Sequence, residues 1–391
     1  MRRRALVCSY GPPQPDRDSG SRRLFDHLEF LVDAGWVVDF VAASGYGEPR
    51  YIDALRQRGI AVFGGDGFDG LAEYGDYDIA LFSFWQNAEQ YIPRMRRLSP
   101  RTRIVVDSVD MQLLRDARRV FASGDGLLAN DYAGEMIGEL NVYAAADLVL
   151  TVSAKEAELI GEFLADPGIA VSVPDNEGLV LSGGSIDERR GVLFVGGFAH
   201  PPNVQAVEYL CKQILPRVDV GLLDQHPVSI VGAGVDDLVR QYARGIPQVE
   251  LVGWVPAVTP YLERARVNVV PLLYGAGTKR KLLQSLMIGT PAVATTVGAE
   301  GLNLIHGTHL LIGDDPASFA EGIERLLQDA PLAQRLAAAA YEHVAPLHSR
   351  DAVQKRFLGL LGEVMDRPAK GELLPDPLPS IYAHRNRFIE L

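Results

Sequence analysis

Short apolar runs alternate with helix-forming segments along most of this chain, and no other feature constrains its fold as strongly. The first run, residues 5–9, precedes a segment in which Leu24, Leu28 and Leu31 share one helical face. Further strand-like runs of the first half lie at residues 37–42, 60–63, 79–82, 104–106 and 148–152. Strands that alternate with helices predict a parallel sheet covered on both faces, and hence an α/β protein.

The same pattern restarts at Gly191, which indicates a second α/β domain. Its strand-like runs lie at residues 192–195, 228–231, 249–252, 267–270, 291–295 and 309–312. Its helical patterns lie at residues 204–215, 278–288, 316–327 and 332–343, with another that begins near residue 236 and a last one from 350 to near 364. Between the halves, residues 166–190 are rich in Gly, Ser, Asp and Pro, which is typical of a linker. A length of 391 residues also suits two domains.

The composition argues against several classes of protein. Acidic residues outnumber basic ones by 50 to 38, so the net charge of −12 does not fit a protein that binds nucleic acid through bulk charge. The two cysteines, Cys8 and Cys211, form no CxxC or Cys/His cluster that would suggest a zinc site. The first ten residues contain only four consecutive apolar residues, too few for a signal peptide or a membrane span. We therefore expect a soluble cytoplasmic protein.

Loops that join a strand to the next helix are the expected ligand sites. Two doubly wound domains that face each other form a cleft at the carboxyl ends of their strands, where helix N-termini offer N–H groups to anions. The first such loop, residues 11–22, is long and polar. In it, Gly20 would let a ligand approach the backbone closely, and Ser19 or Ser21 would cap the helix. The alternative is a turn and a cap without a ligand.

Two other short motifs are less specific. Residues 16–18 and 76–78 are Asp-x-Asp triplets, a pattern that elsewhere holds a metal–nucleotide complex, but such triplets recur by chance and we do not interpret them as metal sites. The turn Gly232-x-Gly234 follows a strand, but the third glycine of the dinucleotide fingerprint would fall at Asp237. We interpret that turn as shaping the chain rather than binding NAD.

The strongest candidate is the glycine-rich turn that follows the fourth strand of the second half. Gly275 and Gly277 lie in the turn, and the first turn of the predicted helix carries Thr278, Lys279 and Lys281, two of only six lysines in the chain. Cations at a helix N-terminus oppose its dipole by about 0.3–1 kcal/mol each. A bound diphosphate would reverse the sign of that effect, so the pattern predicts a diphosphate site. The alternative is a pair of solvated lysines.

Residues 196–203 form another glycine-containing loop between a strand and a helix of the same half. His200 lies in this loop, and both a structural role and contact with a ligand remain open for it. Other polar residues near strand ends are Asp107, Asp110, Glu156, Glu300, His306 and His309. None of them forms a spacing typical of a Ser/His/Asp or Cys/His site.

Several segments, taken in order, resemble the retaining family 4 glycosyltransferases of the GT-B fold (the bacterial glycosyltransferase group 1). In the second half these are Phe194-Val-Gly-Gly-Phe-Ala-His-Pro-Pro-Asn, Gly253-Trp-Val-Pro, Pro271-Leu-Leu-Tyr-Gly-Ala-Gly-Thr-Lys-Arg-Lys and Pro291-Ala-Val-Ala-Thr-Thr-Val-Gly-Ala-Glu-Gly-Leu. In the first half they are Pro15-Asp-Arg-Asp-Ser-Gly-Ser and Thr151-Val-Ser-Ala-Lys-Glu. The resemblance covers roughly residues 4–360.

The resemblance implies two Rossmann-like domains that face each other across a cleft. Residues 1–180 would be the acceptor domain, residues 190–345 the nucleotide-sugar domain, and residues 346–391 a helix that crosses back to the first domain, with a tail packed on it. By the same analogy, the transferred sugar, the diphosphate, the ribose and the base would contact Ser19, Gly20, Gly197, His200, Asn203, Trp254, Val255, Gly275, Gly277, Thr278, Lys279, Lys281 and Gln284. Trp254 and Val255 would meet the nucleobase, and Gln284 the ribose.

The chain departs from the family pattern at two positions. The family usually has two glutamates eight positions apart, the first beside the sugar and the second on the ribose, where this chain has Ala276 and Gln284. The Arg and Lys that commonly bind the diphosphate after the first strand of this domain are also not evident after Phe198. Lys279 and Lys281 would then supply that charge, or donor binding would be altered or lost.

We therefore expect transfer of a sugar from a nucleoside-diphosphate sugar to a glycan, a lipid-linked or a small-molecule acceptor. The resemblance implies retention at the anomeric carbon. No metal and no cofactor beyond the co-substrate is needed if Lys279 and the helix N-terminus stabilise the departing diphosphate. Asp110 and Glu300, or Asp107, would contact the acceptor or the sugar.

Other hypotheses remain open from the sequence. Ala276 and Gln284 also fit a non-catalytic GT-B protein that acts as the partner or scaffold of an active transferase. A further hypothesis is a different GT-B enzyme, such as an inverting transferase or an epimerase. The acidic chain gives little support for more than peripheral membrane association. The tail after residue 366 is either disordered or docks its Arg/aromatic end, residues 382–388, on the body or on a partner, which would allow an oligomer.

Overall fold

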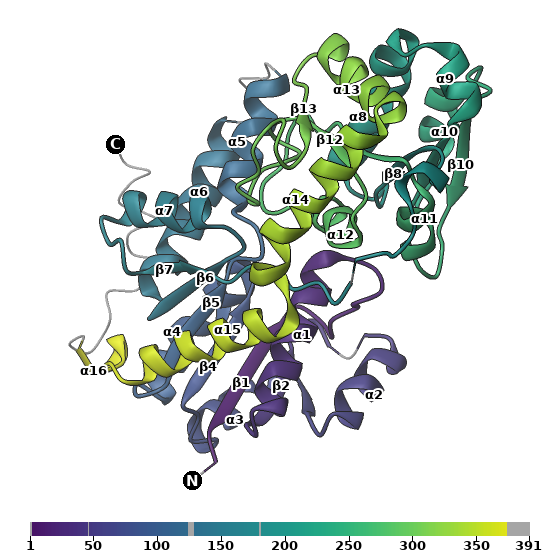
Figure 1. Cartoon of the computed structure of the whole chain (residues 1–391). Helices are drawn as coiled ribbons and strands as arrows, with labels where there is room; N and C mark the ends of the chain where they lie inside the picture. Colours follow the sequence, from purple (N-terminus) through teal and green to yellow (C-terminus); the bar gives the residue numbers. More distant parts are fainter. Residues whose placement is uncertain (1, 46, 124–128, 180, 374–391) are drawn as a thin grey trace. The chain divides into compact units, whose positions relative to one another are not determined.

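The chain folds into two α/β units. The computed structural model describes residues 2–45, 47–123, 129–179 and 181–373 (Figure 1). One unit contains the chain up to Asn176 together with the segment from Asp351 onward, and the other contains Glu177–Arg350. The predicted tail segment 382–388 lies outside the described residues.

The first unit is built on a seven-stranded sheet in the order β3-β2-β1-β4-β5-β6-β7, and every pair is parallel. The strands are β1 (Arg4–Ser9), β2 (Val37–Ala42), β3 (Ala61–Gly64), β4 (Ile79–Ser83), β5 (Arg103–Asp107), β6 (Leu148–Thr151) and β7 (Ala170–Ser172). The helices are α1 (Ser19–Asp33), α2 (Pro49–Gln57), α3 (Phe68–Tyr74), α4 (Trp85–Leu98), α5 (Gln112–Ser123), α6 (Ala129–Ala145), α7 (Ala154–Leu164), α15 (Arg350–Met365) and α16 (Lys370–Leu373).

Both faces of this sheet are covered, because each strand is apolar on both sides. Along β1, Ala5 and Val7 point to one face, and Leu6 and Cys8 to the other. The first face packs against α1, α2 and α15, and the second against α3, α4 and α6. This is the architecture expected of a parallel sheet in an α/β protein.

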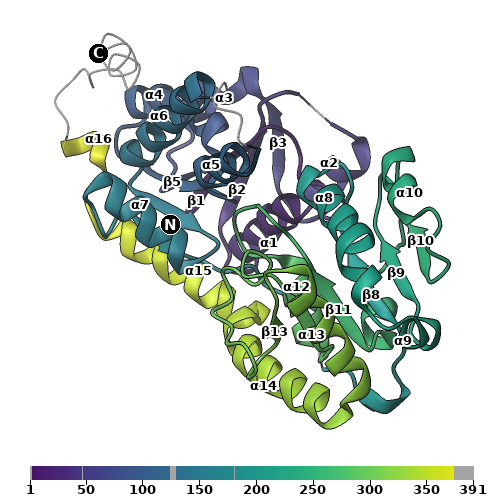
Figure 2. The ribbon, with the colours of Figure 1, turned by 90° about the horizontal axis from the view of Figure 1, so that it is seen from above.

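The second unit has a six-stranded parallel sheet in the order β10-β9-β8-β11-β12-β13. Its strands are β8 (Val192–Val195), β9 (Val228–Val231), β10 (Val249–Gly253), β11 (Val267–Val270), β12 (Ala292–Ala294) and β13 (Leu311–Ile312). Its helices are α8 (Pro201–Tyr209), α9 (Val220–Gln225), α10 (Asp237–Ala243), α11 (Thr259–Arg264), α12 (Arg280–Ile288), α13 (Pro316–Gln328) and α14 (Ala330–His348). Helix α13 packs against β12 and β13, and α14 against α12 (Figure 2).

The predicted α/β class with two parallel sheets is confirmed, and so is the return of the last helix to the first unit. Helix α15 buries Val353, Phe357 and Leu361 in the core between α1 and the sheet. The interpretation of residues 166–190 as one linker was wrong in part, because β7 lies within it and pairs with β6. The strand was missed because it is only three residues long and lies between two prolines.

Two predicted helix starts also need correction. Helix α1 is capped by Asp18, whose carboxylate accepts the N–H of Ser21 at 2.7 Å, and not by Ser19 or Ser21. Helix α12 begins at Arg280 rather than at Thr278, with Lys279 at its N-cap position. Lys279 therefore precedes the helix and does not lie in its first turn.

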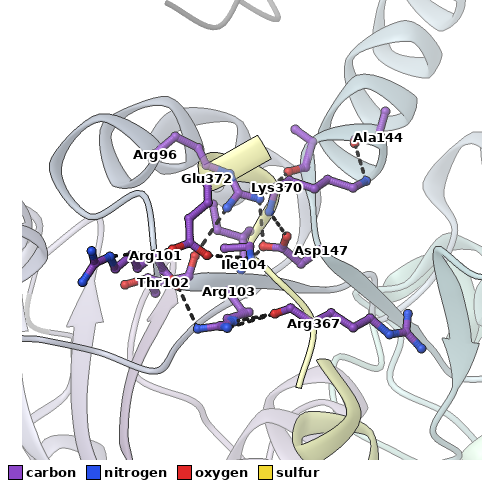
Figure 3. A network of polar contacts seen from close by, with 12 residues as sticks. Arg96, Arg101, Thr102, Arg103, Ile104, Ala144, Asp147, Arg367, Lys370 and Glu372 are labelled. Carbon is purple, nitrogen blue, oxygen red and sulfur yellow. Dashed lines mark hydrogen bonds and ion pairs between the residues drawn. The ribbon is translucent and has the colours of Figure 1, made fainter. Parts of the chain in front are cut away.

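The end of the described chain is fixed to the first unit by polar contacts (Figure 3). The buried Asp147 carboxylate accepts hydrogen bonds from the backbone N–H of Lys370, the backbone N–H of Ile104 and the Arg96 guanidinium, at 2.6, 2.6 and 2.8 Å. A Cβ atom at Gly371 would lie 2.5 Å from the Pro100 carbonyl oxygen, so only glycine fits there. The segment after α15 is therefore docked against the loops at the amino ends of β5 and β6.

Candidate functional site

The turn between β11 and α12 brings together most of the residues predicted to bind a diphosphate. Gly275 and Gly277 have φ angles of 140° and 68°, a region of the backbone that favours glycine. Both are buried, and together they let the chain reverse between the buried strand β11 and the start of α12. The turn therefore opens at the carboxyl end of a central strand, where open α/β sheets bind their ligands.

Lys279 holds the turn in shape. Its ε-ammonium donates to the carbonyl oxygens of Ala276 and Gly277, at 3.0 and 2.5 Å. It also lies 4.0 Å from Glu300 Oε2, in the loop that follows β12. The structure thus brings two predicted catalytic residues, Lys279 and Glu300, side by side, and both are largely buried. The charge of Lys279 is already opposed by carbonyl dipoles and a carboxylate.

Lys281 differs from Lys279 because no carboxylate of the described residues forms an ion pair with it. Its Nζ donates to Asn203 Oδ1 at 2.5 Å and lies 4.7 Å from the centre of the Phe194 ring. The pKa of Lys281 is lowered to about 7, mainly by burial and to a smaller extent by the nearby charge of Lys279. An anion placed beside this ammonium would reverse that shift.

A third cation, Arg280, begins α12, and the sequence interpretation did not include its partner. The guanidinium of Arg280 lies 3.1 Å from Glu177 Oε2. Glu177 belongs to the segment predicted as a linker, more than one hundred positions away, so no local pattern indicated this pair. Of the three positive charges at this helix start, Lys279 and Arg280 thus have carboxylates close by and Lys281 does not.

The loop after β8 closes around Lys281. Asn203 of α8 accepts from Lys281 and donates to the Gly197 carbonyl at 2.7 Å. A Cβ atom at Gly196 would lie 3.0 Å from Lys281 Nζ and 2.9 Å from Asn203 Cγ, so a side chain there would displace the lysine. Gly197 and His200 of the same loop are exposed, and His200 lies at the N-cap position of α8.

The Gly232-x-Gly234 turn has a packing role. A Cβ atom at Gly232 would lie 1.9 Å from the Gly196 carbonyl oxygen, which no side chain could tolerate. The φ angles of Gly232 and Gly234, 154° and 81°, also favour glycine. This turn after β9 therefore allows close packing against the loop after β8, which carries Gly196.

The other predicted donor contacts are distributed around the same edge. Trp254 follows β10, and its side chain is 64% exposed, whereas Val255 is half-buried. Thr278 is half-buried in the turn before α12, and Gln284 is half-buried in the middle of that helix. Two histidines noted in the sequence have structural roles: Nδ1 of His306 and of His309 accept backbone N–H groups at 2.9 and 3.1 Å.

In the first unit, the predicted residues lie at the carboxyl edge of the sheet. Ser19 is exposed at the start of α1, and Gly20 is buried behind it. Asp110 follows β5 and accepts from Arg115 at 2.7 Å. Asp107 is fully buried and accepts from Arg23 at 3.0 Å, so it acts inside the core and is not exposed to an acceptor. Burial raises the pKa of Asp107, and Arg23 counteracts that rise.

The Asp-x-Asp triplets are occupied by structural contacts. Asp16 accepts from the Tyr51 hydroxyl at 2.7 Å, Asp18 caps α1, and Asp78 accepts the backbone N–H of Arg4 at 2.8 Å. In the described ranges, no three side chains of His, Cys, Asp or Glu come together as they would around a metal ion. Among the helices that the structure describes, none has both the length and the apolar content to cross a bilayer.

Comparison with known families supports an assignment for the second unit. Residues 189–329 match the family model described as "Glycosyl transferases group 1". These residues include both glycine loops, Trp254, and the whole of α12. The matched region thus contains the charged residues of the site, Lys279, Arg280, Lys281 and Glu300.

Relatives of known name extend the similarity beyond that unit. A D-inositol 3-phosphate glycosyltransferase of Thermomonospora curvata is 27% identical over 324 residues, which cover 73% of this chain and 71% of that protein. A protein of the same name from Frankia alni is 32% identical over 245 residues, covering 54% of this chain and 58% of that protein.

Solved structures show the same fold over nearly the whole length. Sucrose-phosphate synthase from Thermosynechococcus elongatus has a TM-score of 0.72 at 18% identity, covering 93% of this chain and 100% of that chain. HepE of Anabaena, solved in complex with UDP and glucose, has a TM-score of 0.65 at 14% identity with the same coverage. The family match over residues 189–329, the named relatives and the shared fold together support a group 1 glycosyltransferase with the GT-B fold.

Proposed function

We propose that this glycosyltransferase takes its sugar from a nucleoside-diphosphate donor whose diphosphate binds beside Lys281. The observation that carries the proposal is the position of this ammonium at the start of α12, without a carboxylate partner in the described chain. The N–H groups of the first turn of α12 and the dipole of the helix would act on the same diphosphate. Lys279 and Glu300 would keep the glycine turn in the shape that admits it.

The same charges would assist the reaction itself. In the transfer, the bond between the anomeric carbon and the diphosphate oxygen breaks, and the acceptor oxygen bonds to that carbon. Negative charge grows on the departing diphosphate, which Lys281 and the helix N-terminus would stabilise. The departing phosphate oxygen would take the acceptor proton, so that the new bond forms on the face from which the leaving group departs. We therefore propose retention, without a metal ion.

Ala276 and Gln284 stand where the family usually has two glutamates. We expect these two replacements to change how the donor is bound and not which reaction is catalysed. Gln284 would offer an amide to a ribose hydroxyl, which gives a weaker hydrogen bond than a carboxylate does. Ala276 leaves the sugar side of the turn without a carboxylate of its own. Glu300, whose Oε2 lies 4.0 Å from Lys279 Nζ, brings a carboxylate to the turn from the loop after β12. Glu300 would then contact the transferred sugar.

For the acceptor, we propose a hydroxyl of a sugar or polyol bound at the carboxyl edge of the first unit, near Gly20 and Asp110. The names of the Thermomonospora and Frankia relatives specify an inositol phosphate, which is a polyol, and this supports the class of acceptor. The Anabaena HepE complex with UDP and glucose supports a uridine nucleotide as the first donor to test.

Binding of nucleoside diphosphates tests the donor site. We expect UDP, GDP or dTDP to bind the wild type in calorimetric titration, and K281M to weaken that binding about tenfold or more, because one charge-assisted contact is lost. K212M is the matched control, since Lys212 lies in the same unit but pairs with Glu208 on an exposed surface. Equal affinity of K281M and the wild type, or no binding by the wild type, would show that the proposal is wrong.

The reaction course is tested separately on a donor that binds. The anomeric coupling constant in the proton spectrum of the product distinguishes retention from inversion. Turnover in the presence of a chelator distinguishes a metal-free reaction from a metal-dependent one. We expect retention and unchanged turnover.

A further inference from the structure

A strained backbone segment follows β5 in the first unit. Val109 has a φ angle of 62°, which a β-branched residue rarely adopts. Asp110, the next residue, is a proposed contact of the acceptor. Strain of this kind persists only where the surrounding structure holds it, and it is concentrated at functional sites. Groups packed around residues 108–113 must therefore hold this conformation.

Two buried carboxylates hold this segment, and they come from helices further along the chain. Glu139 of α6 accepts the backbone N–H groups of Gln112 at 3.0 Å and of Leu113 at 2.7 Å. Its Oε1 also accepts the Tyr143 hydroxyl at 2.7 Å. Glu156 of α7 accepts the N–H of Met111 at a longer 3.4 Å. Glu139, which is 1% exposed, is thus the main anchor for the start of α5.

On its other side, the segment packs against Gly20. A Cβ atom at Gly20 would lie 2.9 Å from Val109 Cγ1 and 3.2 Å from Phe84 Cζ. Phe84 itself has a φ angle of 66° after β4. Two strained residues at neighbouring strand ends therefore converge on the start of α1, on the edge where the acceptor is proposed to bind.

We propose that Glu139 is a positioning residue for the acceptor side of the reaction. By holding the N–H groups of Gln112 and Leu113, it keeps Val109 against Gly20 and Asp110 at the edge of the sheet. Glu139 is too deeply buried to touch a substrate, so it acts only through this segment. The inference rests on the proposed function, since it assumes that the first unit receives the acceptor.

The variants E139Q and Y143F separate the two kinds of contact that Glu139 makes. In E139Q, one carboxylate oxygen becomes an NH₂ group, and in either orientation that group faces a backbone N–H that has no other acceptor in this arrangement. In Y143F, only the hydroxyl contact disappears, and both backbone N–H groups keep the carboxylate. Y143F is therefore the matched control for a buried change that leaves the anchor in place.

Amide hydrogen exchange tests the anchor without any assay of activity. We expect the amides of Gln112 and Leu113 to exchange faster in E139Q than in the wild type and in Y143F, while amides of the second unit are unchanged. Equal exchange at these two amides in all three proteins would overturn the proposal.

Kinetics at pH 8 with a donor that binds then test the role in the reaction. We expect E139Q to lower kcat/KM for the acceptor by about ten- to a hundredfold, because a small displacement of a positioned group has a large effect on rate. The dissociation constant for the nucleoside diphosphate should stay within about twofold, since the donor site lies in the other unit. A variant with fast exchange but wild-type acceptor kinetics would show that Glu139 only stabilises the fold. If the wild type itself transfers no sugar, the proposed function fails, and the exchange data alone decide whether Glu139 anchors the segment.

Discussion

His27 of α1 lies flat against Phe357 of α15, with ring centroids 4.4 Å apart and planes inclined by 6°. Burial, together with the neighbouring Arg23 charge, holds the pKa of His27 well below its usual value, so both stacked rings are neutral at neutral pH. Helix α15 follows the second unit in the chain, yet its apolar face completes the core of the first unit. This stack is therefore part of the attachment between the end of the chain and α1.

Truncation of that contact should destabilise the first unit. Phe357 is fully buried, so we expect F357A to lower the free energy of unfolding by about 3–5 kcal/mol. K355A on the exposed side of the same helix should change it by less than about 0.5 kcal/mol. Chemical denaturation followed by circular dichroism measures both. A loss in F357A no larger than that in K355A would contradict the packing described for α15.

A methyl group at Gly20 should disturb the acceptor edge directly. Its Cβ would lie 2.9 Å from Val109 Cγ1, so the strained segment would have to move. We expect G20A to cost about 1–3 kcal/mol of stability and to reduce transfer. G362A on α15 is the control, because nothing lies within 4 Å of its Cβ position, and there alanine should stabilise the helix by about 0.5–1 kcal/mol. Denaturation midpoints and transfer rates of the two variants provide the comparison.

The docked end of the chain depends on one carboxylate (Figure 3). Both carboxylate oxygens of Asp147 accept hydrogen bonds from N–H groups. In D147N one oxygen becomes an NH₂ group, which would face one of these N–H donors, and the buried Arg96 guanidinium would lose its anion. We expect a loss of about 3–5 kcal/mol. E372Q should cost no more than about 1 kcal/mol, because the ion-pair partner, Arg101, is 88% exposed and the amide oxygen can still accept the Ala369 N–H. Thermal unfolding of both variants would contradict this account if their midpoints shifted by the same amount.

The pH dependence of stability should carry a contribution from Glu139. Burial raises the pKa of this carboxyl from 4.5 to about 7, so the folded protein binds the proton more tightly than the unfolded chain. Its contribution to stability is full below pH 4.5 and is lost as the pH rises to about 7, a total of about 3 kcal/mol. Denaturation of the wild type and E139Q across this range should show a difference that changes with pH in that direction. A constant difference would contradict the raised pKa.

Most strands could be predicted from the sequence because they are mainly apolar runs between helical patterns. Val192–Val195 and Val267–Val270 were predicted residue by residue, since burial on both faces makes these runs almost wholly apolar. The one polar residue in them, Asn268, is buried and donates to the Ser285 hydroxyl. The strand β7 was missed because Ala170–Ser172 carries little pattern in three residues. Three residues are too few to show the alternation of apolar and polar positions by which a strand is predicted.

In the candidate site, local sequence patterns could not predict contacts between residues that are far apart in the chain. The sequence pointed to Lys279 and Lys281 together, because both follow the glycine turn. Their different environments come from Glu300 and Asn203, which other strands and helices bring to them. Likewise, Glu139 lies in the middle of a helix, and nothing near it in the sequence indicates that it caps another helix. Such pairings follow from the tertiary fold, so local patterns could not reveal them.

The lowered pKa of Lys281 gives the donor site a pH dependence of its own. In the free protein this ammonium loses its proton near pH 7, whereas a bound diphosphate would favour the charged form. Above pH 7, binding must therefore take up a proton, so the dissociation constant should rise by up to about tenfold per pH unit. Between pH 7.5 and 9 the terminal phosphate of the nucleotide is already ionised and adds no dependence of its own, since its pKa is about 6. Calorimetric titration over that range should show this rise in the wild type and in K212M, and a flat, weaker profile in K281M. A flat profile in the wild type would mean that Lys281 keeps its proton throughout and that its charge does not depend on the ligand.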